Sequence, residues 1–496
     1  MEEDICKGLN KRGIPISVRE VSYLAKKFIV NLAIAHKESV GEISELLSSR
    51  GGYILHLDGT CEGGSPHLMC GMDGISKIVL DNIKLPSEKS EKIIPFLKRI
   101  KNAFGIPLAL VHDMGSGILQ SIETVFKGIA DFICHYHFLR DIGKDLFEEE
   151  NDIVRKRLRH HGIQALLLKK ANQLKKKIDC DTGMINSVTK SLENNRIEPA
   201  DIEQTPLVVA YVLIQWALDG KKQGNGYGFP FDQPYLSFYQ RLQTLHEVCE
   251  ELQPMQLQGS FWRDNKHFYK IYFLLEKTLR DKKMHAAAMD MQEKIIVFEE
   301  LREAMRIADP TDKQGLNDSS EDVDIKTIEK EVKIFRHWLT NHETYLKHKN
   351  YQKMIKQIDK YWKKLFSDPI IVETRNGKIA IQPQRTNNIL ERFFRGLKRD
   401  SRKKSGSISV GKTLKAMLAD APLVKNLENP QYLKIILNGK ASLEERFAEI
   451  DTKIVREELK KSQEDLQKVP KKIRTIIKIP ELPKAFINLF AGQLKI

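Results

Sequence analysis

The sequence predicts an α/β protein whose mixed sheet is interrupted by a large all-helical insertion. Short apolar segments rich in β-formers occur between residues 53 and 135, and strand character returns between 370 and 382. Long, lysine-rich helical patterns fill the interval between them. We therefore expect a helical segment at 1–48, the first part of the α/β domain at 49–147, the insertion at 148–365, the last part of the α/β domain at 366–410, and a basic helical region at 411–496.

The composition indicates a soluble protein with a polyanionic partner. The 496 residues are 41% hydrophobic and 30% charged, and the formal net charge is +15. This positive excess favours nucleic acid or an anionic membrane surface, but no apolar run approaches the roughly 18–20 residues that span a bilayer. Six scattered cysteines indicate a reducing interior. We expect no membrane partner, and a location that is cytoplasmic and nucleoid-associated in a prokaryote or nuclear in a eukaryote.

Residues 1–48 are expected to form helices joined by tight turns. A short helix and a glycine-containing turn precede Ser17 and Glu20, which form a capping box at the start of the next helix. A second box, Ser39 with Glu42, is expected to start one more helix. Two helices joined in this way fit a helix-turn-helix whose second helix enters a major groove, and they fit a two-helix packing element equally well.

Residues 53–147 predict a mixed sheet of five strands with helices on its faces. The spacing indicates an antiparallel meander of three strands, followed by two strands that alternate with helices. The expected strands are Tyr53–Leu57, His67–Gly71, Ile78–Ile83, Leu108–Val111 and Asp131–His135, and the expected helices are Glu91–Phe104, Ile118–Lys127 and His137–Phe147.

The interval 148–365 is expected to be helical throughout, apart from irregular loops. An acidic, polar segment at 309–324 is expected to be a mobile loop. After the insertion, Asn376-Gly377 predicts a tight hairpin between two short strands. The expected helices are Ile153–Lys177, Leu207–Leu218, Tyr235–Leu252, Phe268–Met284, Glu293–Ile307 and Ile325–Leu365.

Three acids form a candidate metal-binding set. Asp58 and Asp113 each follow an apolar strand, and Gly59 is expected to end the first of these strands. Glu391 lies on a helix that begins near Thr386. Clustered carboxylates repel one another unless a cation is present, and Mg²⁺ prefers oxygen ligands. The alternatives are a turn-capping role for Asp58 and a solvated helix position for Glu391.

Four sequence blocks carry a resemblance to a known family. They are His-Leu-Asp58-Gly-Thr, Val-His-Asp113-Met-Gly-Ser-Gly, Cys134-His-Tyr-His137-Phe-Leu-Arg-Asp-Ile-Gly and Thr-Asn-Asn-Ile-Leu-Glu391-Arg-Phe-Phe-Arg-Gly-Leu-Lys. Their order, and the position of the helical insertion, resemble the signature of DDE transposases with a Cys/Asp-x-x-His motif. Mutator-like, hAT and related bacterial insertion-sequence enzymes are members of this group.

The resemblance implies an RNase H-like fold in which Asp58, Asp113 and Glu391 hold two Mg²⁺ (or Mn²⁺) ions. Asp58 would bridge both ions, and the other two acids would each hold mainly one. A metal-bound water would cut the phosphodiester at the end of the mobile element, and the freed 3′-hydroxyl would attack target DNA. The implied partner is double-stranded DNA, as transposon ends and as target. A homodimer or higher oligomer is implied because two ends must be joined.

Cys134 and His137 form a Cys-x-x-His motif after the fifth expected strand. This spacing could supply half of a zinc site, but the sequence has no second Cys or His pair at suitable spacing. The resemblance implies instead that Cys134 buttresses the last strand and that His137 acts near the scissile bond as a donor or proton shuttle. A buried core histidine is the alternative for His137, and His135 is expected to lie on the strand.

Basic residues on and after the Glu391 helix are candidate DNA contacts. Glu391, Arg395 and Lys398 lie at i, i+4 and i+7, so they share a helix face. Cations beside a carboxylate centre suit phosphate binding, whereas a solvated surface is the alternative. The candidates are Arg392, Arg395, Lys398, Arg399, Arg402, Lys403 and Lys404.

Three functions fit these observations. The first is an active DNA transposase, and intact acids at all three positions favour it. The second is a domesticated DNA-binding regulatory or architectural protein, and the third is an RNase H-like nuclease without strand transfer. Relatives commonly carry an N-terminal zinc-binding recognition module, and this sequence lacks such a Cys/His array. A naturally short member and the remainder of a longer protein both fit this departure.

Overall fold

The computed structural model describes residues 2–178, 183–194, 205–252, 266–307, 325–346, 348–374, 377–406, 409–464 and 471–493. The chain divides into two compact units. Unit 1 contains Met1–Phe132 and Asp368–Ile496, and unit 2 contains Ile133–Ser367. No helix in the described ranges is both long and apolar enough to cross a lipid bilayer.

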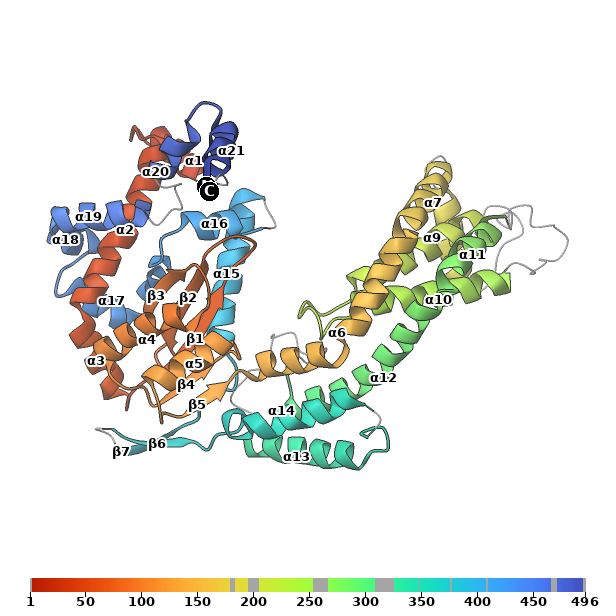
Figure 1. Ribbon diagram of the computed structural model, residues 1–496, viewed down its shortest axis with the longest axis horizontal. Helices are drawn as coiled ribbons and strands as arrows, with labels where there is room; N and C mark the ends of the chain where they lie inside the picture. Colours follow the sequence, from red (N-terminus) through yellow and green to blue (C-terminus); the bar gives the residue numbers. More distant parts are fainter. Residues whose placement is uncertain are drawn as a thin grey trace. The chain divides into compact units, whose positions relative to one another are not determined.

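Unit 1 is built around a mixed five-stranded sheet with the strand order β3-β2-β1-β4-β5 (Figure 1). β1 pairs antiparallel with β2, β2 pairs antiparallel with β3, and β1 pairs parallel with β4. The predicted mixed sheet of five strands is therefore confirmed. The strands are β1 (Ile54–Thr60), β2 (His67–Asp73), β3 (Val79–Leu85), β4 (Ala109–His112) and β5 (Asp131–Ile133).

β1 is longer than the sequence predicted. Gly59 does not end the strand, because Asp58, Gly59 and Thr60 continue to pair with β2. The antiparallel partner satisfies the backbone groups of this segment, and this gain overrides the weak strand preference of glycine. The parallel pairing with β4 stops earlier, at Leu57 and His112. Asp58 is therefore the first residue of β1 beyond the end of β4.

The two faces of the sheet are covered by different elements. On one face, Leu55 and Gly71 lie against α4 (Ser90–Phe104), since a Cβ on Gly71 would lie 2.8 Å from Ile100 and 3.3 Å from Leu55. α5 (Ser116–Val125) packs beside α4. On the other face, Ile54 packs with Ala109 and Val111. Because side chains alternate along a strand, His56 and Asp58 lie on this second face with Ile54.

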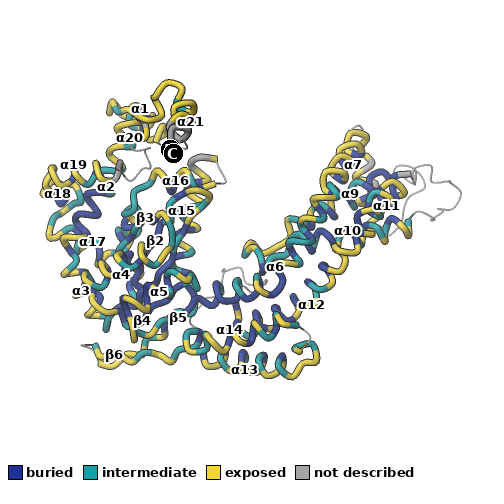
Figure 2. The backbone as a smooth tube through the Cα atoms, in the orientation of Figure 1, coloured by how far each residue is buried: buried dark blue, intermediate teal, exposed yellow. Residues whose placement is uncertain are grey.

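The N-terminal helices belong to the core of unit 1. The capping box predicted at Ser17 is confirmed, because the Glu20 amide donates to Ser17 Oγ at 3.2 Å and the Ser17 amide donates to the Glu20 carboxylate at 2.8 Å. The segment from Val30 to His36 is buried (Figure 2), as the two-helix packing interpretation requires. The helices are α1 (Glu2–Lys11), α2 (Val18–Glu38) and α3 (Val40–Ser49).

The second predicted capping box is wrong. Ser39 has near-helical backbone angles, φ −96° and ψ 16°, because it closes α2 and precedes α3 without an intervening turn. An N-cap side chain reaches its partner amide from an extended backbone. The Ser39 side chain accordingly makes no capping bond.

The C-terminal half of unit 1 begins with a hairpin of two antiparallel strands, β6 and β7. Asn376, predicted in its turn, lies outside the described residues, whereas Gly377 begins β7. The hairpin is followed by α15 (Asn388–Ser405), which carries Glu391. The remaining elements are β6 (Ile370–Thr374), β7 (Gly377–Ile381), α16 (Gly411–Ala416), η3 (Ala421–Glu428), α17 (Pro430–Leu437), α18 (Leu443–Ala448), α19 (Thr452–Glu464), α20 (Lys471–Ile477) and α21 (Leu482–Gln493).

In the described parts of unit 2, every regular element is a helix apart from the last residue of β5. Three helices predicted from periodicity are each divided between two helices of the structure. They are Ile153–Lys177 (α6 and α7), Phe268–Met284 (α11 and α12) and Ile325–Leu365 (α13 and α14). Gly162, at φ 62°, ends α6, and Asp281 caps the start of α12. The segment 309–324 lies outside the described residues. The elements are α6 (His135–His161), α7 (Ile163–Ile178), α8 (Gly183–Asn194), α9 (Thr205–Asp219), η2 (Gly220–Lys222), α10 (Pro234–Leu252), α11 (Lys266–Leu279), α12 (Lys282–Met305), α13 (Ile325–Asn341) and α14 (Lys349–Leu365).

The start of unit 2 differs from the predicted start of the insertion. Unit 2 begins at Ile133, whereas the insertion was expected from residue 148. α6 runs across that position, with a break in helical geometry at Phe147 (φ −146°, ψ 20°). The prediction that His135 lies on a strand is wrong, because β5 ends at Ile133 and His135 opens α6. Its Nε2 atom lies 2.7 Å from the Leu365 carbonyl oxygen.

Candidate functional site

The register of β1 and β4 places two of the three predicted acids side by side. Leu57 pairs with His112 in the parallel ladder. Asp58 and Asp113 are the next residues after this pair in β1 and after β4. They therefore lie next to each other at the same edge of the sheet. Asp58 is 6% exposed and Asp113 is partly buried.

Asp58 has an electrostatic environment that disfavours its charged form. Burial raises its pKa well above the ordinary value of 3.8, and the carboxylates of Asp113 and Glu391 raise it further. The Gly59 amide, which donates to Asp58 Oδ1 at 2.7 Å, opposes this shift. Three carboxylates from distant parts of the sequence therefore lie close enough to repel one another. A hard cation held by carboxylate oxygens would relieve this repulsion, so the donor set fits Mg²⁺ or Mn²⁺.

Glu391 reaches the two aspartates because Asn387 fastens the start of α15 to β1. Asn387 is the N-cap residue of α15, but its side chain makes no capping bond to the helix. Its Nδ2 instead donates to the carbonyl oxygen of Leu57 at 2.7 Å. Its Oδ1 lies 2.9 Å from Nδ1 of His56. The side chain that would ordinarily cap the helix thus fixes the helix start beside Asp58.

The Asn387 contacts determine the tautomer of His56. Asn387 Oδ1 can only accept, so His56 Nδ1 carries the proton and donates. Burial lowers the pKa of His56 to about 4, which keeps the imidazole neutral. A Cβ on Gly74 would lie 2.6 Å from His56 Nε2, so only glycine leaves room for the ring. Sequence reasoning missed both His56 and Asn387, although each lies in a quoted motif block.

Asp113 is held by its own turn and by the preceding histidine. Its Oδ1 accepts a hydrogen bond from the Gly115 amide at 3.0 Å. His112 is fully buried, and its Nδ1 donates to the Asp113 carbonyl at 2.6 Å. These contacts orient the backbone at the point where β4 ends. The adjacent His112-Asp113 pair in the second motif block carried no spacing signal for this role.

Glu88 is a further acid near Asp58 that the sequence did not reveal. It makes the smallest of the contributions that raise the pKa of Asp58. Its Oε1 lies 3.0 Å from Nδ1 of His67, and a Cβ on Gly59 would lie 2.9 Å from the same oxygen. Glu88 lies in the loop before α4, where no strand end or helix periodicity marks it.

The predicted basic residues lie along α15, which is amphipathic. Leu390 and Phe394 are buried in the core, and Phe393 and Leu397 pack against it. Lys398 is partly buried, and its charge lowers the pKa of Glu62, a smaller effect than the hydrogen bond from the Val410 amide. The side chain of Lys404 lies outside the described residues. The exposed cations are Arg392, Arg395, Arg399, Arg402 and Lys403.

Cys134 and His137 belong to unit 2 and lie at the start of α6. Cys134 is the N-cap residue and is fully buried. His137 is also buried, and burial lowers its pKa to about 3, with smaller contributions from Arg140 and Lys144. Its imidazole is therefore neutral at neutral pH. Nδ1 of His137 has no hydrogen-bond partner among the residues that the structure describes.

The comparisons with known proteins add no assignment. No family model matches the chain, and no curated protein matches it. The three carboxylates, the contacts that position them and the motif blocks are therefore the features that bear on function. Acids arranged in this way can hold divalent ions and present them to a phosphodiester.

Proposed function

We propose that unit 1 is the catalytic domain of an RNase H-like DDE transposase, which cuts and joins double-stranded DNA. The observation that carries this proposal is the convergence of Asp58, Asp113 and Glu391, from two neighbouring strands and a distant helix. The strand pattern, three antiparallel strands followed by a parallel one, supports the RNase H-like fold expected from the motif blocks.

The three acids would hold the divalent ions, and Asn387 and the exposed arginines would support them. When bound, Mg²⁺ or Mn²⁺ supplies positive charge for the attacking and leaving oxygens of a phosphodiester. The Asn387 hydrogen bonds hold α15, and with it Glu391, beside β1. Arg395 and Arg399 are exposed one and two turns beyond Glu391, where they can bind DNA phosphates. Joining two DNA ends implies a homodimer or a larger assembly.

Isosteric substitution of the acids tests the proposal. Asp58→Asn, Asp113→Asn and Glu391→Gln should each abolish Mg²⁺-dependent cleavage of duplex DNA while leaving DNA affinity largely intact. Asp400→Asn is the matched control, because it removes an exposed acid from the same helix as Glu391. Full cleavage by all three variants would contradict the assignment.

Two further measurements separate the related functions. Transfer of a pre-cut 3′-hydroxyl end into a second duplex distinguishes a transposase from a simple nuclease. Mg²⁺ should also raise the unfolding temperature of the wild-type chain, and this shift should shrink in Asp58→Asn. DNA binding without cleavage, strand transfer or a Mg²⁺ shift would favour an architectural DNA-binding protein.

A further inference from the structure

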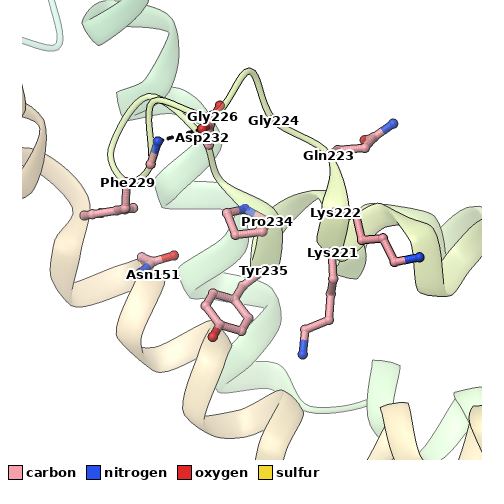
Figure 3. A pocket seen from close by; sticks show the side chains of 11 residues that line it. Asn151, Lys221, Lys222, Gln223, Gly224, Gly226, Phe229, Asp232, Pro234 and Tyr235 are labelled. Carbon is pink, nitrogen blue, oxygen red and sulfur yellow. Dashed lines mark hydrogen bonds between the residues drawn. The ribbon is translucent and has the colours of Figure 1, made fainter. Parts of the chain in front are cut away.

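Unit 2 contains a cavity of about 380 Å³ under the glycine-rich loop that joins η2 to α10. Figure 3 shows its lining: Asn151 projects from α6, Phe229 from the loop, and Tyr235 from the first turn of α10. Lys221 and Lys222 enter from η2. The volume lies within the roughly 300–1,000 Å³ of small-molecule sites. All of the lining residues are described and belong to unit 2.

The loop is shaped by its own side chains. Asp232 accepts hydrogen bonds from the amides of Asn225 and Gly228, both at 2.7 Å. Gly224 has a φ of +149°, and a Cβ there would lie 2.7 Å from the Asp232 carboxyl carbon. Gly226 has a φ of +83°, in the left-handed region that favours glycine. The carboxylate of Asp232 is thus already engaged, and the loop conformation does not depend on a ligand.

The loop is also anchored to α6. Phe231 stacks on Tyr136, with ring centroids 5.0 Å apart and an interplanar angle of 12°. The Tyr136 hydroxyl donates to the Tyr227 carbonyl at 2.9 Å. A Cβ on Gly143 would lie 2.4 Å from Pro230, so helix and loop are in close contact. The cavity is therefore formed by elements already in contact with one another, and such preorganisation lowers the cost of binding a ligand.

One wall of the cavity is aromatic and cationic. Lys221 Nζ lies 5.2 Å from the centroid of the Tyr235 ring and donates to Gln164 Oε1 at 2.5 Å. Burial lowers the pKa of Lys221, and the nearby charge of Arg159 lowers it further. An excess of positive charge in a partly desolvated place favours an anion beside Lys221. Lys222 is more exposed and lies 3.5 Å from Asp219.

The opposite wall holds a buried acceptor that lacks a donor. Asn151 is 8% exposed, and its Oδ1 has no hydrogen-bond partner among the described residues. Figure 3 shows this oxygen on the side of Asn151 that faces Pro234 and Tyr235. A buried acceptor without a partner is costly, so a ligand that donates an N–H group would gain from its presence.

We propose that this cavity binds a nucleotide. The base would lie against Tyr235 and donate an amino or ring N–H to Asn151 Oδ1, and the phosphate would lie at Lys221 and Lys222. A flat ring and a phosphate match the aromatic and cationic wall, and an N–H donor matches the opposite wall with Asn151. The chain's net charge of +15 also favours phosphate-bearing ligands. The nucleotide can be free or can be an unstacked residue of a strand. The acids of unit 1 take no part in this cavity, so nucleotide binding here is independent of the proposed function.

Binding measurements on the full chain test the proposal. The probes are AMP, adenosine, inorganic phosphate, and a duplex oligonucleotide with one unpaired 2-aminopurine whose fluorescence reports unstacking. Asn151→Leu, Tyr235→Leu and Lys221→Ala should each weaken nucleotide binding about tenfold, the loss expected for one good contact. Tyr269→Leu and Lys190→Ala are matched controls on exposed residues of the same unit and should leave binding unchanged.

The probes distinguish the two sources of nucleotide. Saturable binding of AMP that competes with the oligonucleotide supports a site for free nucleotides. Binding of the unpaired 2-aminopurine without AMP binding supports a nucleotide within a strand. Phosphate binding as tight as AMP, or AMP and oligonucleotide binding unchanged in all three cavity variants, would overturn the proposal. Asn151→Leu replaces an unpartnered polar group by an apolar one of similar shape, so its thermal stability should stay near that of the wild type.

Discussion

The side chains of His56 and Asn387 are joined by a 2.9 Å hydrogen bond although 331 residues separate them in the sequence. The same asparagine donates to the carbonyl of Leu57, the residue before Asp58. One amide therefore ties the helix that carries Glu391 to the strand that carries Asp58. The distance between these two acids depends on this contact, and so does any site they form with Asp113.

Asn387→Ala should weaken divalent-ion binding more than it weakens the fold. It removes both bonds to β1 and leaves His56 Nδ1 buried without its Asn387 partner, at about 1–3 kcal/mol for such a group. We expect the Mg²⁺ concentration for half-maximal cleavage to rise and the Mg²⁺-induced shift in unfolding temperature to fall. The measurements are Mg²⁺ titrations of cleavage and of thermal unfolding.

Asn429→Ala is the matched control for Asn387→Ala. Asn429 is the N-cap residue of α17, and its side chain accepts from the amides of Gln431 and Tyr432. Its loss should cost about 1 kcal/mol of stability without changing the Mg²⁺ dependence. Equal Mg²⁺ dependence in the two variants would show that Asn387 has only a structural role.

Gly74→Ala should disturb the same contact from the other side. A Cβ at this position would lie 2.6 Å from His56 Nε2, so the imidazole must shift from the position in which its Nδ1 bonds Asn387. Overpacking of this kind costs about 1–3 kcal/mol. Gly396→Ala is the control, because a Cβ there meets nothing within 4 Å and α15 should gain about 0.5–1 kcal/mol. Urea unfolding of both variants measures the difference; a Gly74→Ala protein as stable as the wild type refutes the steric argument.

Acidification below pH 6.5 should destabilise the protein through its buried histidines. His36 is buried, and this burial lowers its pKa from 6.5 to about 4. Between these values the unfolded chain binds the proton and the folded chain does not, so the free energy of unfolding falls as pH falls, by at most about 1.4 kcal/mol per pH unit for each histidine. His56 and His137 act in the same direction.

His36→Gln isolates the contribution of one histidine. Nε2 of His36 donates to the Leu80 carbonyl at 2.9 Å, and a glutamine amide can replace this donor. The pH dependence of the free energy of unfolding between pH 6.5 and 4 should therefore become shallower. His160→Gln, at an exposed position, should leave the slope unchanged. An unchanged slope in His36→Gln would contradict the assigned role of burial.

The exposed cations of α15 should govern the salt dependence of DNA binding. Each phosphate contact releases about one counterion, so Arg395→Ala with Arg399→Ala should reduce the slope of log affinity against log salt by about 2. A control pair, Lys92→Ala with Lys98→Ala, removes equal charge from exposed positions on α4. Binding titrations at several salt concentrations measure both slopes. If the slope of log affinity against log salt is the same in the two double variants, DNA does not bind at the exposed cations of α15.

The sequence predicted those features that depend on local periodicity and spacing. Such features depend only on residues that are close together in the sequence. They include the five strands, the amphipathic helix at Glu91–Phe104 and the capping box at Ser17. The same local reasoning missed the break at Gly162, because the apolar period continues through it. It also ended β1 too early, because glycine's local preference says nothing about the partner strand β2 that pairs with Gly59.

The sequence by itself determined which acids could form a site, because strand ends and motif blocks are visible in one dimension. Only the tertiary structure decided which groups the Asn387 side chain bonds. An asparagine at an N-cap can cap its own helix or bond another segment, and here it bonds β1 instead of capping α15. It also decided the raised pKa of Asp58, because burial and the charges of Asp113 and Glu391 act through space. The Asn387 bonds join segments more than 300 residues apart, and the pKa shift depends on burial and on charges from other elements, so no local pattern records either.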